Sequence, residues 1–263
     1  MTVKLRIYQV DAFTNEVFGG NPAAVCPLES WLPDSLMQQI AMENNLAETA
    51  FYVRNNDRFA IRWFTPETEV DLCGHATLAT AFVIFNIERF PGPVIELDSR
   101  SGVLRVLNER DFLTLDFPVD TVQKSSAPAG IADALGLPPN EVYKGRTDYL
   151  LVYLTASQIK AMKPNMLRLA EIEARGVIVT APGEGDVDFV SRFFAPQSGI
   201  PEDPVTGSAH TTLTPYWAAR LGRNEFKAQQ LSKRGGSLTC RLAGDRVRIS
   251  GQACLYMTGE IEL

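Results

Sequence analysis

The sequence has little histidine and cysteine, the residues most typical of zinc and other transition-metal sites. Its 263 residues include only two histidines and four cysteines. The cysteines contain no Cys-x-x-Cys pair or other metal-binding spacing; they are Cys26, Cys73, Cys240 and Cys254. The sequence therefore predicts no metal site, and we expect reduced thiols.

Two further absences restrict the class of protein. No apolar stretch approaches the roughly 20 residues of a membrane-spanning helix, and the first residues lack the apolar run of a signal peptide. The formal net charge of −6 argues against a nucleic-acid-binding surface. We expect a soluble cytoplasmic protein with neither a membrane nor a nucleic-acid partner, in which local groups bind any anionic ligand.

Three segments of the first half recur, in the same order, about half a chain later. The matched pairs are residues 62–66 (RWFTP) with 192–196 (RFFAP), Gly74 with Gly207, and 97–102 (LDSRSG) with 231–236 (LSKRGG). Such self-similarity indicates a duplicated unit. We predict an N-terminal domain at 1–118, a linker at 119–128 and a C-terminal domain at 129–263, with the option that closing strands are exchanged with the C-terminus.

Strands outnumber helices in each predicted half, and each half holds one strongly apolar helix. Val3, Leu5 and Ile7 alternate with polar residues, which predicts a first strand. The apolar helices are expected at about 74–86 and 208–221, and each must be covered by its own sheet. The predicted class is α/β (α+β), with two pseudo-symmetric domains, each a mixed, mostly antiparallel β-sheet around a central α-helix.

Both central helices begin at a polar turn that contains glycine, Gly74 in the first and Gly207 in the second. A helix N-terminus presents unpaired N–H groups and the positive end of the helix dipole, so it binds carboxylate or phosphate. If a pseudo-twofold axis relates the halves, the two termini face each other across a cleft and form a site for a small acid. The alternative is two structural turns without a ligand.

Several polar residues near these turns have both a structural and a functional interpretation. His75 lies in the first helical turn, where the dipole favours a neutral imidazole that either contacts a ligand or is structural. His210 lies deeper in its helix and is expected to be structural. Asp203 and Ser208 suit an Asx-turn and a helix cap as well as a ligand site. Cys73 is either a small buried side chain or a thiolate base at a helix start.

Two further candidates precede predicted strands. Glu48 stands among small and apolar residues just before a strand at 50–53, so its carboxylate is either solvated at the strand end or enclosed in an apolar site. Residues 18–25 (FGGNPAAV) contain a glycine pair and Asn21-Pro22, which predict a loop. That loop either approaches a ligand or is a plain turn.

Four motifs together resemble the phenazine-biosynthesis isomerase family, which shares the fold of diaminopimelate epimerase and proline racemase. The motifs are residues 20–25 (GNPAAV), 46–51 (LAETAF), 72–77 (LCGHAT) and 203–210 (DPVTGSAH). The resemblance covers essentially the whole chain. It implies two similar α/β halves with the site between them, activity without a metal, flavin or pyridoxal cofactor, and commonly a homodimer.

The resemblance also implies roles for particular residues. The glutamate that matches Glu48 is the acid/base that moves a proton on trans-2,3-dihydro-3-hydroxyanthranilate. Positions that match His75, Asp203 and Ser208 complete the site. The glycine turns at Gly74 and Gly207 and the segment containing Asn21 are assigned to substrate binding. The expected ligand is a small carboxylic acid.

Two alternatives stay open. Related epimerases use two cysteines, one at each helix start; here Cys73 has the first place but Thr206 has the second. This argues against a two-thiol racemase and leaves a Cys73-dependent racemase, epimerase or dehydratase of a small amino or imino acid. A non-catalytic protein that binds a small ligand or a partner on the same scaffold is the second alternative.

Overall fold

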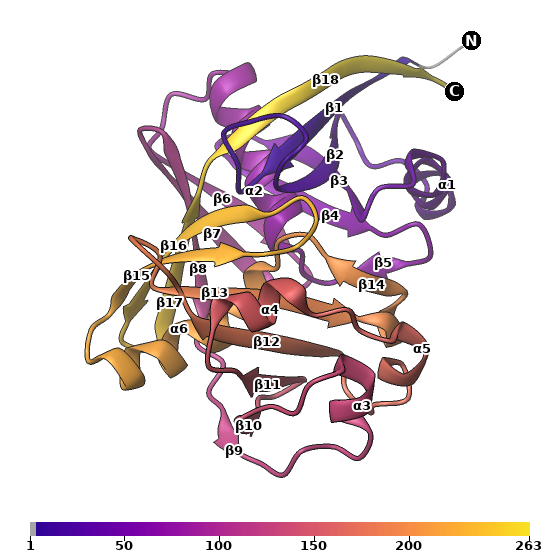
Figure 1. Cartoon of the computed structure of the whole chain (residues 1–263). Helices are drawn as coiled ribbons and strands as arrows, with labels where there is room; N and C mark the ends of the chain where they lie inside the picture. Colours follow the sequence, from indigo (N-terminus) through magenta and orange to yellow (C-terminus); the bar gives the residue numbers. More distant parts are fainter. Residues whose placement is uncertain (1–3) are drawn as a thin grey trace. The chain divides into compact units, whose positions relative to one another are not determined.

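The computed structural model describes residues 4–263, which form two compact units (Figure 1). The first unit holds the described residues up to Asp116 together with Ser250–Leu263, and the second is Phe117–Ile249. The chain enters the second unit within β8 (Phe112–Pro118) and leaves it within β17 (Arg246–Gly251). Val3, part of the predicted first strand, lies outside the described residues.

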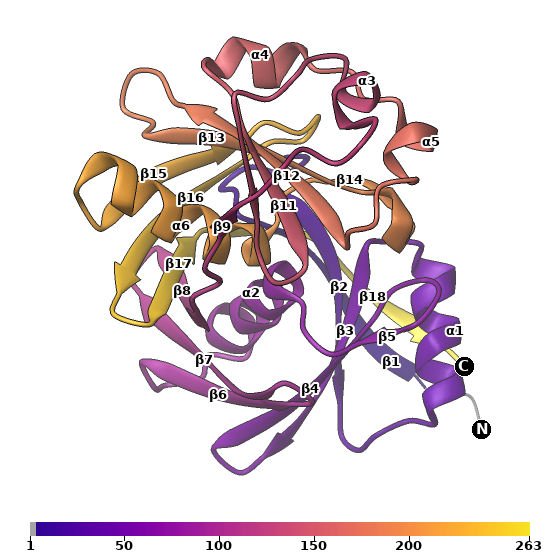
Figure 2. The same cartoon turned by 90° about the horizontal axis from the view of Figure 1, so that it is seen from below.

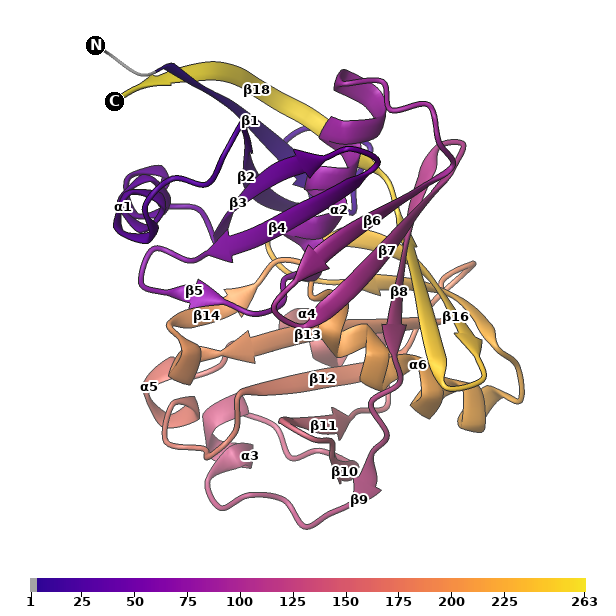
Figure 3. The ribbon, with the colours of Figure 1, turned by 180° about the vertical axis from the view of Figure 1, so that it is seen from behind.

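The C-terminal strand belongs to the first unit and not to the second. β18 (Ala253–Glu262) pairs antiparallel with β1 (Lys4–Ala12), with Lys4 opposite Glu262, and the two strands run side by side in Figures 1 and 3. The predicted domain at 129–263 therefore differs from the observed unit at its C-terminal end. The closing strand β18 belongs to the first unit, as the predicted exchange of closing strands allows. The predicted linker contains β9 (Gln123–Lys124), which pairs with β10 (Glu141–Lys144).

The first unit alternates strands with three helical segments. Its remaining elements are β2 (Asn21–Leu28), α1 (Asp34–Asn44), β3 (Glu48–Asn55), β4 (Arg58–Phe64), β5 (Glu69–Val70), α2 (Gly74–Phe82), the π-helical η1 (Val83–Ile87), β6 (Val94–Ser99) and β7 (Gly102–Glu109). The second unit follows the same plan with additional short helices. Its remaining elements are α3 (Ile131–Leu135), β11 (Asp148–Val152), α4 (Ala156–Ala161), α5 (Met166–Leu169), β12 (Gly176–Pro182), β13 (Phe189–Ala195), η2 (Pro196–Ser198), β14 (Ile200–Asp203), α6 (Gly207–Leu221), β15 (Glu225–Gln230) and β16 (Gly236–Ala243).

The two units repeat one succession of strand pairings, in the order antiparallel, parallel, antiparallel, antiparallel, parallel, antiparallel. In the first unit these join β1–β2, β2–β3, β3–β4, β4–β5, β4–β6 and β6–β7. In the second they join β10–β11, β11–β12, β12–β13, β13–β14, β13–β15 and β15–β16. The mixed sheets and the duplication predicted from the sequence are confirmed.

A matched ion pair accompanies the repeated topology. Arg62 on β4 donates two hydrogen bonds to the carboxylate of Glu69, each of 2.7 Å. Arg192, its counterpart on β13, donates two to Glu202, of 2.7 and 3.0 Å. Two-pronged pairing of this kind fixes the orientation of both side chains, so the repeat extends from the backbone to side-chain geometry.

The central helices occupy the places predicted for them. In the first unit α2 packs against β1, β2 and β3, and Figure 2 shows it enclosed by the strands of that unit. In the second unit α6 lies against one face of the sheet (Figure 3), where Trp217 stacks on Phe189 with ring centroids 5.6 Å apart. The indole N–H of Trp217 donates to Thr180 Oγ1 at 3.1 Å.

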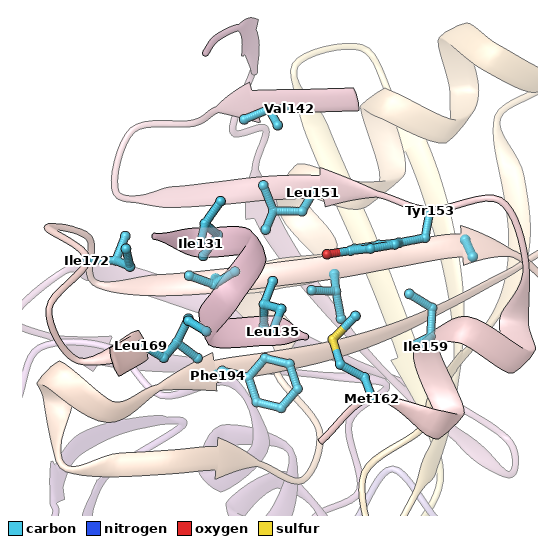
Figure 4. Packing of buried hydrophobic residues seen from close by; sticks show 14 of the residues in the cluster. Ile131, Leu135, Val142, Leu151, Tyr153, Ile159, Met162, Leu169, Ile172 and Phe194 are labelled. Carbon is cyan, nitrogen blue, oxygen red and sulfur yellow. The ribbon is translucent and has the colours of Figure 1, made fainter. Parts of the chain in front are cut away.

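The opposite face of the second sheet carries a separate apolar core (Figure 4). Val177 and Val179 of β12 point to this face, since alternate residues of a strand share a side. Ile131 of α3, Ile159 of α4 and Leu169 of α5 pack against them. Within residues 4–263 no helix is both long and apolar enough to cross a membrane.

The segment predicted as a loop at residues 18–25 becomes a strand from Asn21 onward. Asn21 and Pro22 pair with Ala12 and Asp11 of β1. Proline is tolerated here because it stands near the beginning of the strand. Only the part before Asn21 turns, and Gly20 completes that turn with φ of +59°.

Replacing Gly20 by alanine is expected to destabilise the first unit by about 1–3 kcal/mol. The added Cβ would lie 2.1 Å from the carbonyl oxygen of Ala12, and the backbone conformation disfavours any side chain. Gly102→Ala is the matched control, because Gly102 also has a positive φ but open space around it. Thermal melting should show a clearly larger loss for Gly20→Ala; equal losses would mean that the clash is relieved.

Candidate active site

Four polar side chains meet in the first unit at the beginnings of three elements. Asn21 begins β2, Glu48 begins β3, Cys73 precedes α2 as its N-cap, and His75 lies in the first turn of α2. Their exposures are 0% for Asn21, 8% for Glu48, 6% for Cys73 and 4% for His75. Glu48 is therefore enclosed, and the interpretation that it is solvated at a strand end is wrong.

His75 is at the centre of this cluster. Its Nε2 lies 3.1 Å from Glu48 Oε2, and its Nδ1 lies 3.0 Å from Asn21 Nδ2. Cys73 Sγ is 3.6 Å from Nδ1 and 4.0 Å from Nε2. The imidazole thus links the carboxylate to the amide, with the sulfur beside the ring.

The partner on Nδ1 decides where the imidazole carries its proton. With the amide nitrogen of Asn21 donating to Nδ1, a neutral His75 must hold its proton on Nε2, which faces Glu48. When His75 is protonated, Nδ1 becomes a donor, and Asn21 can present its oxygen by turning its amide. Asn21 can therefore serve both protonation states.

The electrostatics reverse one expectation for His75. Burial by itself favours the neutral ring, but the interactions with Cys73 and Glu48 beside it outweigh that effect and raise the pKa of His75 well above its usual value. Burial first, and then the charge of Glu48, raises the pKa of the Cys73 thiol to about 11. The shift of the His75 pKa is opposite in direction to the one that the helix dipole alone predicts.

Alkylation of Cys73 should be slow at neutral pH and should accelerate as the pH rises toward about 11. The thiolate is the reacting species, and the raised pKa keeps its fraction small below that range. Peptide-resolved mass spectrometry after iodoacetamide treatment measures the rate, with the more exposed Cys254 as the internal reference. Faster labelling of Cys73 than of Cys254 at neutral pH would contradict this account.

A second polar group, in the second unit, holds Asp203 at the end of β14. Thr206 Oγ1, at the N-cap of α6, donates to Asp203 Oδ2 at 2.5 Å. Gln230 Nε2 donates to the Asp203 backbone oxygen at 2.7 Å, and Gln230 Oε1 accepts from the Thr206 N–H at 2.8 Å. Asp203 is 8% exposed and Gln230 is fully buried, so buried hydrogen bonds hold the turn from Asp203 to Thr206 in place.

Ser208 joins a different network, one residue inside α6, which begins at Gly207. Arg175 donates to Ser208 Oγ at 3.2 Å. The same guanidinium donates to both carboxylate oxygens of the buried Asp148. Ser208 thus lies beside a cation whose position is fixed by an acid.

His210 has the structural setting expected for it. Its ring is fully buried, Nδ1 lies 2.8 Å from the backbone oxygen of Thr206, and burial lowers its pKa to about 4. The ring is therefore neutral at physiological pH. Thr77 makes the same contact in the first unit, donating from Oγ1 to the Cys73 oxygen at 2.5 Å.

The structure unites some predicted residues and adds others. Asn21, Glu48 and His75 meet in the first unit, whereas Asp203 and Ser208 of the second unit belong to separate networks. Sequence reasoning missed Gln230 and Arg175. Gln230 had a signal, because it shares the alternating inward face of β15 with two apolar residues. Arg175 had none, since its acidic partner is distant in sequence.

A family model for phenazine biosynthesis-like proteins matches residues 10–259. An uncharacterised isomerase of Pseudomonas aeruginosa is 53% identical over 262 residues, which cover 99% of this chain and 100% of the relative. The crystal structure of a PhzF-family phenazine biosynthesis protein from Enterococcus faecalis has a TM-score of 0.96 and 47% identity, covering 99% of this chain and 100% of that chain.

The fold reaches beyond these relatives. A hydroxyproline epimerase from Agrobacterium vitis, solved with trans-4-hydroxy-L-proline bound, has a TM-score of 0.65 with 12% identity, covering 99% of this chain and 93% of that one. At this identity the likeness concerns the fold alone, and it agrees with the epimerase-like architecture predicted from the sequence.

Proposed function

This chain belongs to the phenazine biosynthesis-like protein family, and from that premise we propose that it is a cofactor-independent isomerase of a small cyclic or hydroxylated carboxylic acid. The observation that carries the proposal is the buried carboxylate of Glu48, 3.1 Å from His75 Nε2. A substrate like trans-2,3-dihydro-3-hydroxyanthranilate fits the proposed chemistry.

Glu48 acts as base and then as acid in this proposal. Its carboxylate removes a proton from an activated carbon, and the electrons of that C–H bond move into the adjacent unsaturated system. Glu48 then returns the proton at a second carbon, so the substrate gains and loses no atoms or electrons. The imidazolium of His75 stabilises the carboxylate and shares the proton, and Asn21 orients the ring.

The substrate's own charge needs donors that fit an anion. We assign the N–H groups at Gly74 and Gly207, where the two central helices begin, to the carboxylate or to the negative charge that develops during the reaction. Ser208 adds a hydroxyl, and Asp203 orients a polar group of the substrate. We further propose that the enzyme is a cytoplasmic homodimer, which light scattering of the purified protein tests.

Burial of Cys73 supports Glu48 over a thiol as the base. A racemase or dehydratase that depends on Cys73 requires a thiolate near neutral pH, but the pKa of this thiol is raised to about 11. All the motif residues expected from the family are present, which argues against a protein that kept the scaffold for binding but lost catalysis.

Deuterium uptake tests the proposal. The protein is incubated in D₂O with dihydro-hydroxyanthranilate and a panel of small hydroxy and amino acids, and the label is read by mass spectrometry. We expect uptake into an acid with an activated C–H bond, without added metal or cofactor. Tight binding of one of these acids with no uptake would contradict the isomerase and favour a binding protein.

A further inference from the structure

We propose that the cluster of Glu48, Cys73 and His75 binds a zinc-type divalent cation, and that the bound ion inhibits the enzyme. The binding part is independent of the proposed function, while the inhibitory part rests on it. Neither the spacing of the cysteines nor the family comparison indicates this site; it arises from the tertiary structure.

The three donors already have nearly the spacing that such an ion requires. One ligand atom from each residue lies within 4.8 Å of the others. His75 Nε2 is 3.1 Å from Glu48 Oε2 and 4.0 Å from Cys73 Sγ. Tetrahedral zinc, with bonds of about 2.0–2.3 Å, separates its donors by roughly 3.3–3.6 Å. Small side-chain rotations of Cys73 and Glu48 are therefore sufficient to form the site.

The chemistry of the donors selects a soft cation. Cysteine sulfur, imidazole and one carboxylate match zinc, cobalt or copper, and they do not suit magnesium or calcium, which take oxygen ligands. A carboxylate and a thiolate together neutralise a divalent charge, which reduces the cost of burying the ion. Among the described residues, Glu48 Oε2 is buried without a hydrogen bond of standard geometry, so a cation would also satisfy this oxygen.

Asn21 supplies the outer contact that metal-bound histidines usually have. With Nε2 bound to the ion, Nδ1 carries the proton and donates to the side-chain oxygen of Asn21 once its amide turns. Three protein ligands leave one position for water, as in open zinc sites. The ion would then occupy the carboxylate and the imidazole on which the proposed proton transfer depends, and a chelator should reverse the inhibition.

Direct binding is measured first, without any substrate. Wild-type protein is titrated with ZnCl₂ against a chromophoric chelator, and with CoCl₂ while the thiolate-to-cobalt absorption band is recorded. We expect one ion per chain and a cobalt–thiolate band. Cys73→Ser should abolish the band and weaken zinc binding by more than about 100-fold, since even outer contacts of metal ligands contribute about 10- to 100-fold.

Controls separate the site from other thiols and from misfolding. Cys254→Ser removes a more exposed cysteine and should leave both readouts unchanged. Glu48→Gln keeps the sulfur and should retain a weakened band, and circular dichroism checks the fold of each variant. A wild-type protein without the band, or a band that persists in Cys73→Ser, would overturn the site.

Inhibition is measured second, on deuterium uptake by the wild type with and without zinc. Uptake that stops with zinc and returns with EDTA supports the full proposal, and uptake that continues with zinc bound overturns its inhibitory part. If the cobalt band forms but no substrate takes up label, the proposed function fails while the metal site stands. If label is taken up but no band forms, the metal site fails while the proposed function stands.

Discussion

Replacing Glu48 by glutamine is expected to lower the rate of deuterium uptake by about 100- to 10,000-fold, the usual contribution of a general acid–base group. The amide has nearly the same volume as the carboxylate but cannot accept the substrate's proton. It also removes the negative charge 3.1 Å from His75 Nε2, so the raised pKa of His75 should fall toward its usual value. Mass spectrometry of the substrate measures the rate, and NMR titration of His75 measures the second effect.

Two variants control this experiment. Glu43→Gln makes the same chemical change on the exposed side of α1 and should leave uptake unchanged. Cys73→Ser should retain most of the uptake, because a thiol with a pKa of about 11 does not act as the base near neutral pH. Full uptake with Glu48→Gln, together with loss in Cys73→Ser, would transfer the role of base to the cysteine.

Replacing Trp217 by alanine is expected to lower the free energy of unfolding of the second unit by about 3–5 kcal/mol. Trp217 is 1% exposed, lies stacked on Phe189 and donates to Thr180. The substitution leaves a cavity between α6 and the sheet and removes the donor for Thr180. Urea denaturation followed by circular dichroism gives the change, with a midpoint shift at similar slope as the expected form.

Trp31→Ala is the matched control for this prediction. Trp31 is 38% exposed, and the guanidinium carbon of Arg62 lies 5.6 Å from the centroid of its ring. An exposed contact of this kind contributes about 0.5–1 kcal/mol, so the loss should be several times smaller than for Trp217. Similar losses for the two variants would show that α6 repacks to fill the cavity.

Much of the fold could be predicted because its signals are local. The apolar helices that begin at Gly74 and Gly207 were placed to within a residue at their N-termini, since a glycine turn followed by an apolar run is a strong local pattern. The duplication was visible because both copies keep the arginine that forms the paired ion bridge, Arg62 and Arg192. The C-terminal end of the first apolar helix departs from the predicted α-helix, because the π-helical η1 follows α2 there.

The chemistry of the candidate site was only partly visible. Glu48 stands out by its apolar neighbours, and His75 by its place at a helix start. The contact between Glu48 and His75 could not be predicted from the sequence, because it depends on β3 lying parallel to β2 and on α2 packing against both strands. Cys73 and Glu48, which lie against the ring of His75, raise its pKa in spite of burial, whereas the helix dipole alone predicts a lowered pKa.

The sequence by itself determined the family, the repeated architecture and the residue types available for proton transfer. These follow from motifs and periodicities within short stretches, where neighbouring residues interact directly. The tertiary structure alone decided that β18 joins the first unit, that Glu48 is buried against His75, and that Cys73 completes a cluster able to hold a metal. Each of these is a contact between distant segments, and such contacts are created by strand pairing and packing of the whole unit.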